Sequence, residues 1–480
     1  MPAHSKTKHV VVLMLENRSF DHMFGFLDHP KKFEGLHGKK FTNPDNNKVE
    51  IPATPTAGFE VPHDPSHRHF SVMYQLTETD PSGNPKHYKP PYPINMRGFV
   101  KEFERHAPGK GAEIMRCQPP GNIPVLATLA KSFALCDHWH ASVPGMTWPN
   151  RFFAHAAQSS ATVNNYLALY GMTTIYHALS KAKKSFKVFD HGDAHARAMP
   201  VTWNHRRMMD NFFDRVKKDD LPDYSFIEPN HLGDPAVTNS QHPGKNEPPT
   251  GGADFKKGEQ LIRSIYRALI ANEAVWKKTV FVITYDEHGG FADHVPPPRA
   301  VPPNELMSPE RFGFDLLGVR VPAVIVSPYI KAATVDSTVY DHSSIVASVR
   351  EQFGIAKALT ERDANAKTFW HNLTLAEPRL GAAIPTLEDS GFEALESMAE
   401  AVSVDAPAPA EDDFDMVWIA QQLDRVMAAK EAAKIESPKA MTEAMAAPVK
   451  ESFDTTRDVG EYAQQVDKRF KNPPDWKKYR

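Results

Sequence analysis

Short apolar runs rich in β-branched residues recur along this chain, and each run ends in polar, glycine or proline residues. Such runs are typical of strands that are buried on both faces of a sheet. Five of them stand at residues 9–15, 186–189, 224–227, 279–285 and 321–327. Helix-like stretches lie between them, for example at 123–133, 255–271 and 343–353. This alternation predicts an α/β fold with a mainly parallel central sheet and helices on both faces.

The domain organisation follows from length and from one change in composition. The 480 residues, 41% of them hydrophobic, are enough for a large core. We expect one body over residues 1–397, a linker over 398–413 that contains VDAPAPAEDD, and an amphipathic helical tail over 414–480. The tail is expected to pack on the body or on a second subunit, which would make the protein a homo-oligomer. Docking of another partner is the alternative.

Proline-rich segments stand at 41–65, 81–93 and 296–303, in a chain with 41 prolines. We expect these segments to be ordered loops over the sheet. Long loops in a compact enzyme often shape its binding site.

Charge, hydropathy and cysteine content narrow the classes of partner and location. A formal net charge of -3 gives no general attraction to nucleic acid, and we expect no such partner. The apolar runs are shorter than the roughly 20 residues that span a bilayer, so we expect no transmembrane segment. The polar start of the chain carries no export signal, which predicts a cytoplasmic location, with secretion or a periplasmic location as the alternative. Cys117 and Cys136 are expected to be two reduced thiols, although one bridge between them is an alternative.

The first chemical cluster, ENRSFD, directly follows the apolar run at 9–15. The carboxyl ends of strands open onto the ligand crevice of an α/β sheet. Glu16 and Asn17 offer hard oxygen donors there, which suit a divalent cation. Ser19 can cap the next helix, and Asp21 favours its first turn. The alternative is that Glu16 and Asn17 only cap or pair locally.

The second cluster repeats this arrangement after the apolar run at 279–285. Asp286 and Glu287 are adjacent acids, which are costly to bury together unless a positive charge neutralises them. Gly289 and Gly290 allow a tight turn beside them. The two clusters together indicate a metal site.

The third cluster is SVPGMTWPNR at 142–151. Pro149 suits the first turn of a helix, and Thr147 stands near its N-cap. A hydroxyl at that point lies where backbone amides and the helix dipole favour an anion. Thr147 is therefore a candidate nucleophile, or a residue that merely caps the helix.

These three blocks, with TYDEHGGFADHVPPP as the full second block, resemble the signature blocks of a bacterial phosphoesterase family. That family includes phosphatidylcholine-type phospholipases C and a respiratory-burst-inhibiting acid phosphatase, and it is similar in fold to alkaline phosphatase and the sulfatases. The resemblance covers roughly residues 8 to 360. Further matching pieces are SFIEP at 225–229, QHP at 241–243, GVRVPAVIVSPY at 318–329 and YDHS at 340–343.

The resemblance implies a role for each matching residue. The implied metal ligands are Glu16, Asn17, Asp286 and Glu287. Thr147 becomes the covalent nucleophile, and His242 contacts phosphate or protonates the leaving group. Substrate-binding roles are expected for His67, Asn150 and His191. The cofactor is a divalent ion, with calcium, magnesium, manganese and zinc all left open.

The activity implied is metal-dependent hydrolysis of phosphate esters, of the phospholipase C or acid phosphatase type, through a phosphothreonine intermediate. The substrate is a phosphate ester or phospholipid, and the choice between monoester and diester stays open. Two alternatives remain. One is a sulfatase or phosphonate hydrolase on the same fold, which Thr147 disfavours because sulfatases need a modifiable Cys or Ser. The other is a non-catalytic binding or scaffold protein.

Overall fold

The computed structural model describes residues 6–387, except residues 60, 80–89, 167, 192–193, 232–237 and 245–254. The expected boundary at 397, the linker at 398–413 and the tail at 414–480 lie outside these residues. Most of the proline-rich segment at 81–93 lies outside them too.

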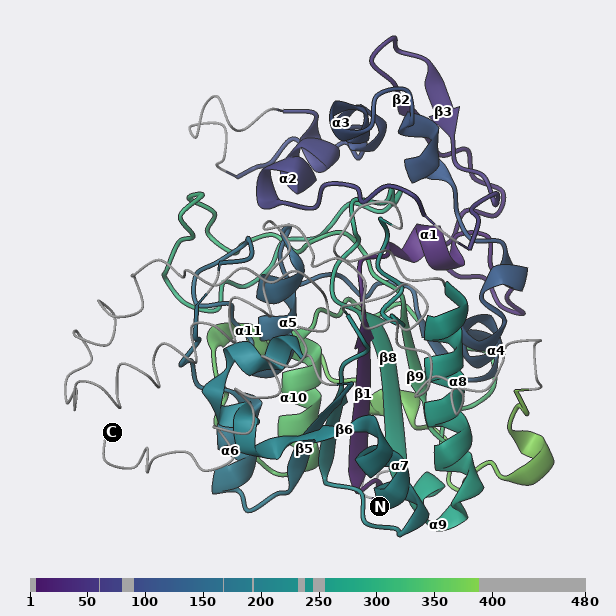
Figure 1. Ribbon diagram of the computed structural model, residues 1–480, viewed down its shortest axis with the longest axis vertical. Coiled ribbons are helices and arrows are strands. Elements are labelled where there is room, and N and C mark those ends of the chain that lie inside the picture. The colour runs from purple at the N-terminus through teal and green to yellow at the C-terminus, as the bar shows by residue number, and fades with distance from the viewer. Residues whose placement is uncertain are drawn as a thin grey trace, which may run out of the picture.

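Within the described residues the core of the molecule is an eight-stranded sheet with the order β10-β4-β9-β8-β1-β7-β5-β6 (Figure 1). Its strands are β1 His9–Leu15, β4 Ala134–Cys136, β5 Phe186–Asp190, β6 Arg206–Met208, β7 Tyr224–Ile227, β8 Thr279–Tyr285, β9 Ala323–Val326 and β10 Thr334–Asp336. Neighbouring strands are parallel except that β9 runs antiparallel to both β8 and β4. The predicted α/β fold with a mainly parallel sheet is confirmed.

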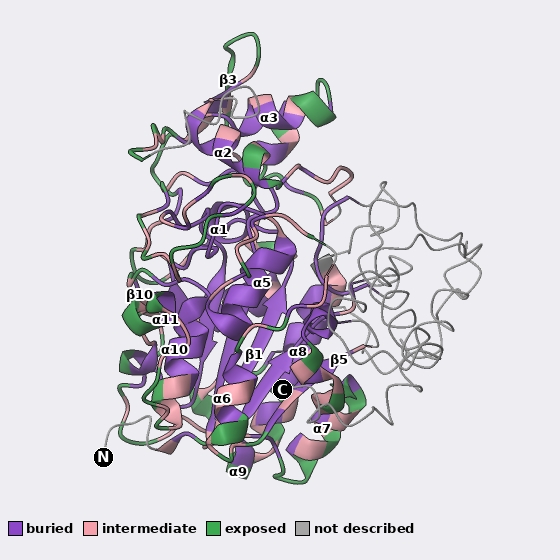
Figure 2. Ribbon diagram, turned by 90° about the vertical axis from the view of Figure 1, so that its left-hand side faces the viewer, coloured by how far each residue is buried: buried purple, intermediate pink, exposed green. Residues whose placement is uncertain are grey.

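The five apolar runs all form strands, and their residues explain why. Every residue of β8 is buried, and in β1 only His9 at the first position is partly exposed. A strand covered on both faces has no solvent side, so its sequence is continuously apolar instead of alternating. Figure 2 shows the sheet almost uniformly buried. Strands β4, β6 and β10 were not predicted, because three residues each are too few to give a recognisable run.

Helices cover the two faces of this sheet in two groups (Figure 1). The helices of the first group pack against one another, and they are α4 Pro124–Ser132, α7 Met209–Lys217, α8 Phe255–Ala271 and α9 Glu273–Trp276. The other comprises α5 Thr147–Ala156, α6 Ile175–Lys181, α10 Ser343–Gln352 and α11 Glu361–Asn365. The three helices expected at 123–133, 255–271 and 343–353 are thus present as α4, α8 and α10.

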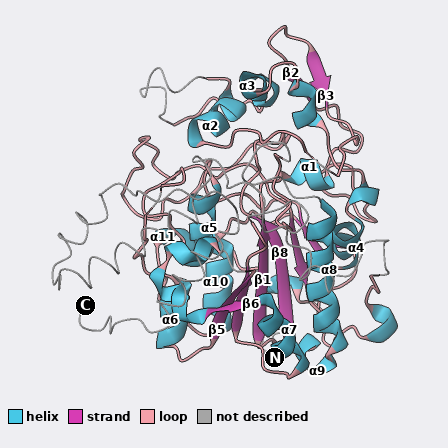
Figure 3. Cartoon of the chain, viewed as in Figure 1, coloured by secondary structure: helices cyan, strands magenta, loops and turns pink. Residues whose placement is uncertain are grey.

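A cap lies over the edge of the sheet at which β1 and β8 end (Figure 1, top). It is built from the antiparallel pair β2 Thr42–Pro44 and β3 Glu50–Pro52, and from α2 His69–Thr77 and α3 Phe99–His106. A second hydrophobic cluster supports the cap, with Val72 and Leu76 of α2 against Phe99 and Phe103 of α3. Figure 3 shows loops gathered between the cap and the sheet. The short helix α1 Phe20–Phe24 follows β1 at this edge, and its N-cap Ser19 accepts from the His22 amide as expected.

Two further sequence expectations concern thiols and membrane crossing. Cys117 and Cys136 are both free and buried, in agreement with two thiols. Among the described residues no helix has the length and apolar character needed to cross a membrane.

Candidate active site

The ends of two adjacent parallel strands place the first two sequence clusters side by side. Leu15 at the end of β1 pairs in register with Tyr285 at the end of β8. The residues that follow, Glu16 with Asn17 and Asp286 with Glu287, therefore leave the sheet at the same edge. All four residues are buried, with exposed fractions of 3% or less. The structure brings together the four residues that were expected to hold a metal.

Asn17 and Asp286 are joined through the backbone at this edge. The Asn17 amide donates to Asp286 Oδ1 over 3.0 Å. Asn17 has a φ of 57°, a left-handed conformation that Asn tolerates better than most residues. Gly289 packs so closely on Asn17 that an added Cβ would lie 2.2 Å from the Asn17 carbonyl oxygen. The tight turn expected at Gly289 and Gly290 therefore packs the backbone of the second cluster against the backbone of the first.

Thr147 is the first residue of α5, and its hydroxyl faces the same edge. Oγ1 donates to Asn17 Oδ1 over 3.4 Å, and Thr147 is 6% exposed. The N-cap is Met146, whose side chain makes no capping hydrogen bond. The hydroxyl of Thr147 is thus directed to the metal-ligand candidates and does not cap the helix. The Trp148 amide already donates to the Asn165 side chain, so the helix terminus offers fewer amides to an anion than we expected.

Asn150 lies behind Thr147 in the same helix and is fully occupied by backbone contacts. Its Oδ1 accepts from the Val143 amide over 3.0 Å. Its Nδ2 donates to the carbonyls of Val143, Gly145 and Met146. These bonds fix the turn that presents Thr147. The structure places Asn150 where it supports the loop rather than where it faces a substrate.

Two histidines lie on the cap side of the site. His242 Nδ1 donates to the Pro243 carbonyl over 2.7 Å, and its Nε2 accepts from Asn17 Nδ2 over 2.8 Å. The His67 ring lies 6.3 Å from the His242 ring, and its Nδ1 is 3.9 Å from Glu287 Oε1. Burial alone would lower the pKa of His67, but the charges of Glu287 and Asp64 outweigh it and raise the pKa to about 8. His67 therefore favours its cationic form next to Glu287.

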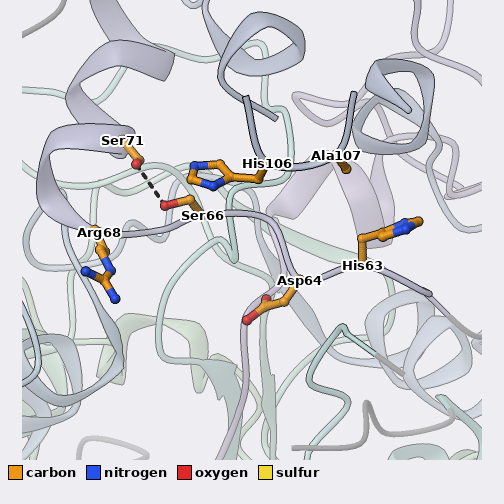
Figure 4. Close-up of a pocket in the computed structure, with 7 residues that line it drawn as sticks. All are labelled: His63, Asp64, Ser66, Arg68, Ser71, His106 and Ala107. Carbon is orange, nitrogen blue, oxygen red and sulfur yellow. Dashed lines mark hydrogen bonds between the residues drawn. The ribbon is translucent and has the colours of Figure 1, made fainter. Parts of the chain in front are cut away.

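A pocket of about 410 Å³ adjoins the segment that carries His67 (Figure 4). Asp64, Ser66 and Arg68 line this pocket, and Figure 4 shows the hydrogen bond between Ser66 and Ser71. His67 is not among the lining residues, since it is turned toward Glu287. One segment thus faces the pocket and the buried carboxylates with alternate residues.

A buried arginine holds the carboxylates on the opposite side. Arg151 Nε donates to Asp286 Oδ2 over 3.1 Å, and Nη2 donates to the Leu15 carbonyl over 3.0 Å. The same guanidinium lies 3.8 Å from Glu16 and 3.5 Å from Glu228. The sequence placed Arg151 in the third block without a role, and Glu228 belongs to the SFIEP block. Arg151 lies one helical turn after Thr147 in α5, and Glu228 directly follows β7; these positions are the signals that could have found them.

His195 and His231 were not identified from the sequence, because neither lies in a recognised block. Both are buried against Glu16, with His231 Nδ1 2.9 Å from Oε2 and His195 Nδ1 3.8 Å from Oε1. His191, which was expected to bind substrate, lies on this side of the site. Burial is the main cause that lowers its pKa to about 4, and the charge of His231 adds to the effect.

The carboxylates at the strand ends lie close enough to disfavour one another's charge. Burial, together with the neighbouring Glu287 and Glu16, raises the pKa of Asp286 to about 7 against the lowering effect of Arg151. Glu287 Oε1 is buried without a hydrogen-bond partner, while Oε2 accepts from the Gly289 amide. Carboxylate and amide oxygens are the donors that hard divalent cations take. The residues present therefore fit a divalent metal ion.

A second acidic group nearby is already neutralised. Arg320 Nε donates to Asp293 Oδ1 over 2.9 Å, and its Nη2 donates to Asp21 Oδ1 over 3.0 Å. His294 Nδ1 lies 2.6 Å from Asp21 Oδ2. This network ties the loop after β8 to α1, and its buried guanidinium supplies the positive charge that a metal would otherwise bring.

Comparisons with known proteins identify the relatives of this chain. The model of the phosphoesterase family matches residues 7–356. Non-specific phospholipase C5 of Arabidopsis thaliana is 34% identical over 412 residues, which cover 78% of this chain and 75% of the relative. The non-hemolytic phospholipase C of Burkholderia pseudomallei is 28% identical, and the alignment covers 74% of this chain and 57% of that protein. A solved structure in the alkaline phosphatase superfamily from Vibrio parahaemolyticus is 14% identical with a TM-score of 0.32, over 51% of this chain and 64% of that one.

The matched span contains all three sequence blocks and every residue discussed at the strand ends. The resemblance inferred from those blocks is therefore confirmed, and so is the assignment of the protein as a phosphoric ester hydrolase. The chain belongs to the phosphoesterase family.

Proposed function

We propose that the protein is a metal-dependent phospholipase C that works through a covalent intermediate on Thr147. One observation carries this proposal. The Thr147 hydroxyl lies 3.4 Å from Asn17 Oδ1, at the edge where Asp286 and Glu287 also leave the sheet. Relatives named as phospholipases C, such as the one at 34% identity, support a phospholipid as the substrate class.

The residues proposed to hold the ion are Glu16, Asn17, Asp286 and Glu287. When bound, a divalent cation would lower the pKa of the nearby hydroxyl and neutralise charge on the phosphate. Oxygen donors favour calcium, magnesium or manganese, whereas the imidazoles close by also admit zinc. Asn17 is oriented for this task, because His242 accepts from its Nδ2 and leaves Oδ1 facing Thr147.

The proposed chemistry has two steps. The Thr147 oxygen forms a bond to phosphorus while the bond from phosphorus to the glycerol oxygen breaks, and the diacylglycerol leaves as an alcohol. Water then attacks the same phosphorus, releases the phosphorylated headgroup and restores the Thr147 hydroxyl. A buried, oriented nucleophile gains from positioning and from the local electrostatics at once.

The leaving alcohol needs a proton, and we assign its transfer to His67. The charges of Glu287 and Asp64 favour the protonated form of this ring. His242, which was expected to contact phosphate or to protonate the leaving group, has both ring nitrogens engaged by Pro243 and Asn17. Its proposed role is therefore to orient Asn17, while His67 acts as general acid.

The test is to quench the enzyme in acid during turnover of a phosphatidylcholine with a labelled headgroup and to map the labelled peptide. Label on Thr147 is expected. Label on another residue would overturn the mechanism. So would turnover of the wild type without any trapped label, if the Thr147→Ala variant also keeps its activity. A chromogenic phosphate monoester, its sulfate analogue and a phosphonate monoester, assayed in parallel, separate a phospholipase C from the phosphatase, sulfatase and phosphonate hydrolase alternatives.

A further inference from the structure

Glu16, His195 and His231 form a compact buried group beside the proposed catalytic residues. One potential ligand atom from each lies within 4.8 Å of the others, and all three residues are buried. The two imidazole rings lie against each other, with centroids 4.1 Å apart. Their Nδ1 atoms both approach the Glu16 carboxylate, at 2.9 Å for His231 and 3.8 Å for His195.

Nδ1 of His195 is buried and has no hydrogen-bond partner, whereas Nδ1 of His231 lies 2.9 Å from Glu16 Oε2. The approach of His231 to Glu16 is within hydrogen-bonding distance, whereas the 3.8 Å separation of His195 Nδ1 from the same carboxylate is too long for a hydrogen bond. Buried polar atoms are nearly always paired, because an unpaired one costs free energy. The unpaired Nδ1 of His195 faces the carboxylate that His231 also approaches, which indicates a group that binds all three residues.

The surroundings of His231 match those of a metal-bound histidine. Its Nε2 lies 3.0 Å from Glu228 Oε2, which accepts the ring proton. Ligating histidines usually donate their second ring nitrogen to a carboxylate in this way, which fixes the tautomer and turns the other nitrogen toward the metal. Glu228 is itself held by the backbone amides of His195 and Ala196 at 3.0 and 2.9 Å. One carboxylate thus positions both histidines.

A proton on His231 is the competing explanation, since it would join Glu16 to Glu228 through one cationic ring. It would leave His195 Nδ1 buried and unpaired, because the 3.8 Å gap to Glu16 stays open. A metal ion engages both rings.

We propose that Glu16, His195 and His231 bind a transition-metal ion of the zinc type, in addition to the hard cation assigned to Glu16, Asn17, Asp286 and Glu287. Two imidazole nitrogens and one carboxylate select zinc, cobalt or nickel over calcium and magnesium. Glu16 adjoins Asn17 in the chain and is the residue common to both sites. The proposal stands on the histidine group and does not depend on Thr147 being a nucleophile.

The decisive measurement is an anomalous difference map of the wild-type protein, freed of metal and then loaded with zinc, recorded at the zinc edge. A peak about 2.0–2.1 Å from Nδ1 of both His195 and His231 is expected. No peak between these atoms at saturating zinc would overturn the proposal, whatever occupies the neighbouring site.

Metal content in solution gives an independent readout. His195→Gln and His231→Gln should each lose one tightly held zinc per chain, while Asp286→Asn keeps the zinc on the histidines. His155→Gln is the matched control, because His155 Nε2 is also buried without a partner but belongs to no metal-binding group among the described residues. Unchanged zinc in His195→Gln would overturn the proposal. If His195→Gln and His231→Gln lose this zinc but the trapping experiment leaves Thr147 of the wild type unlabelled, only the proposed function is refuted.

Discussion

Arg151 Nε donates to Asp286 Oδ2 over 3.1 Å, and both side chains are wholly buried. This contact joins the helix that begins with Thr147 to the strand end that carries the acids. It fixes the distance between the proposed nucleophile and the proposed metal ligands, because Arg151 also donates to the Leu15 carbonyl at the end of β1.

Removal of this guanidinium should affect folding and activity together. Arg151→Ala leaves Asp286, Glu228 and Glu16 without their buried counter-charge, which typically costs about 3–5 kcal/mol. Denaturant unfolding should show this loss, and turnover should fall at least tenfold in the fraction that stays folded. The exposed Arg116→Ala is the control and should change neither quantity. An Arg151→Ala protein with wild-type stability would show that the ion pairs do not hold the site together.

Thr147→Ala should lower turnover at least about a thousandfold, because it removes the atom that attacks phosphorus. Stability should change by less than about 1 kcal/mol, since the hydroxyl does not cap α5. Thr147→Ser should retain much of the activity, as it keeps the hydroxyl. Turnover and thermal unfolding of both variants are the measurements. Near-normal turnover in Thr147→Ala would remove Thr147 from the mechanism.

Asp286→Asn and Glu16→Gln should each abolish metal-dependent hydrolysis without unfolding the protein. Each change removes a charged oxygen donor at a buried site and keeps the shape of the side chain. Activity and bound metal should be measured together after chelation and re-addition of calcium, magnesium, manganese or zinc. Asp28→Asn, an exposed acid, serves as the control. Full activity of either variant after metal re-addition would show that the substituted residue is not a metal ligand.

Glu259 should make stability fall as pH rises. Burial raises its pKa to about 8, and the amides of Leu126 and Val125 only partly offset this. Between its usual pKa of 4.5 and about 8, the unfolded chain is ionised at Glu259 while the folded protein keeps the proton. Folding stability should therefore decrease across this window by up to about 1.4 kcal/mol per pH unit, and level off above it. Unfolding curves from pH 5 to 9 measure this slope.

Glu259→Gln is the matched variant, because its amide oxygen can still accept from Val125 and Leu126 without carrying a charge. The slope between pH 5 and 8 should be shallower in this variant, and its stability at pH 9 should exceed that of the wild type. Identical slopes in the two proteins would mean that Glu259 does not titrate with a raised pKa.

A chain cut after Ser403 should fold and hydrolyse substrate. The family match ends at residue 356, before the expected linker at 398–413. Turnover, and oligomeric state by light scattering, should be compared with the full chain. Loss of soluble protein would assign the tail to the folded body, whereas a change from oligomer to monomer with activity kept would assign it to assembly.

The sequence by itself determined the fold class and the edge at which the site lies. The runs at 9–15 and 279–285 are continuously apolar because both strands are buried on both faces, so they were recognisable without any structure. Polar residues placed directly after such strands lie at a common sheet edge by geometry alone. The candidates Glu16, Asn17, Asp286 and Glu287 were predictable for that reason. Thr147 was predictable because it stands at the start of a helix.

The tertiary structure alone decided which side chains face one another. His195 and His231 follow no recognisable pattern, and only the pairing of β7 beside β1 carries Glu228 and His231 to Glu16. Asn150 could not be separated from a substrate ligand until its amide was seen to hold three loop carbonyls. The direction of β9 was equally hidden, since an apolar run has the same composition in either orientation. Sequence patterns report which residues are buried, whereas contacts between distant segments depend on how the strands are ordered in the sheet.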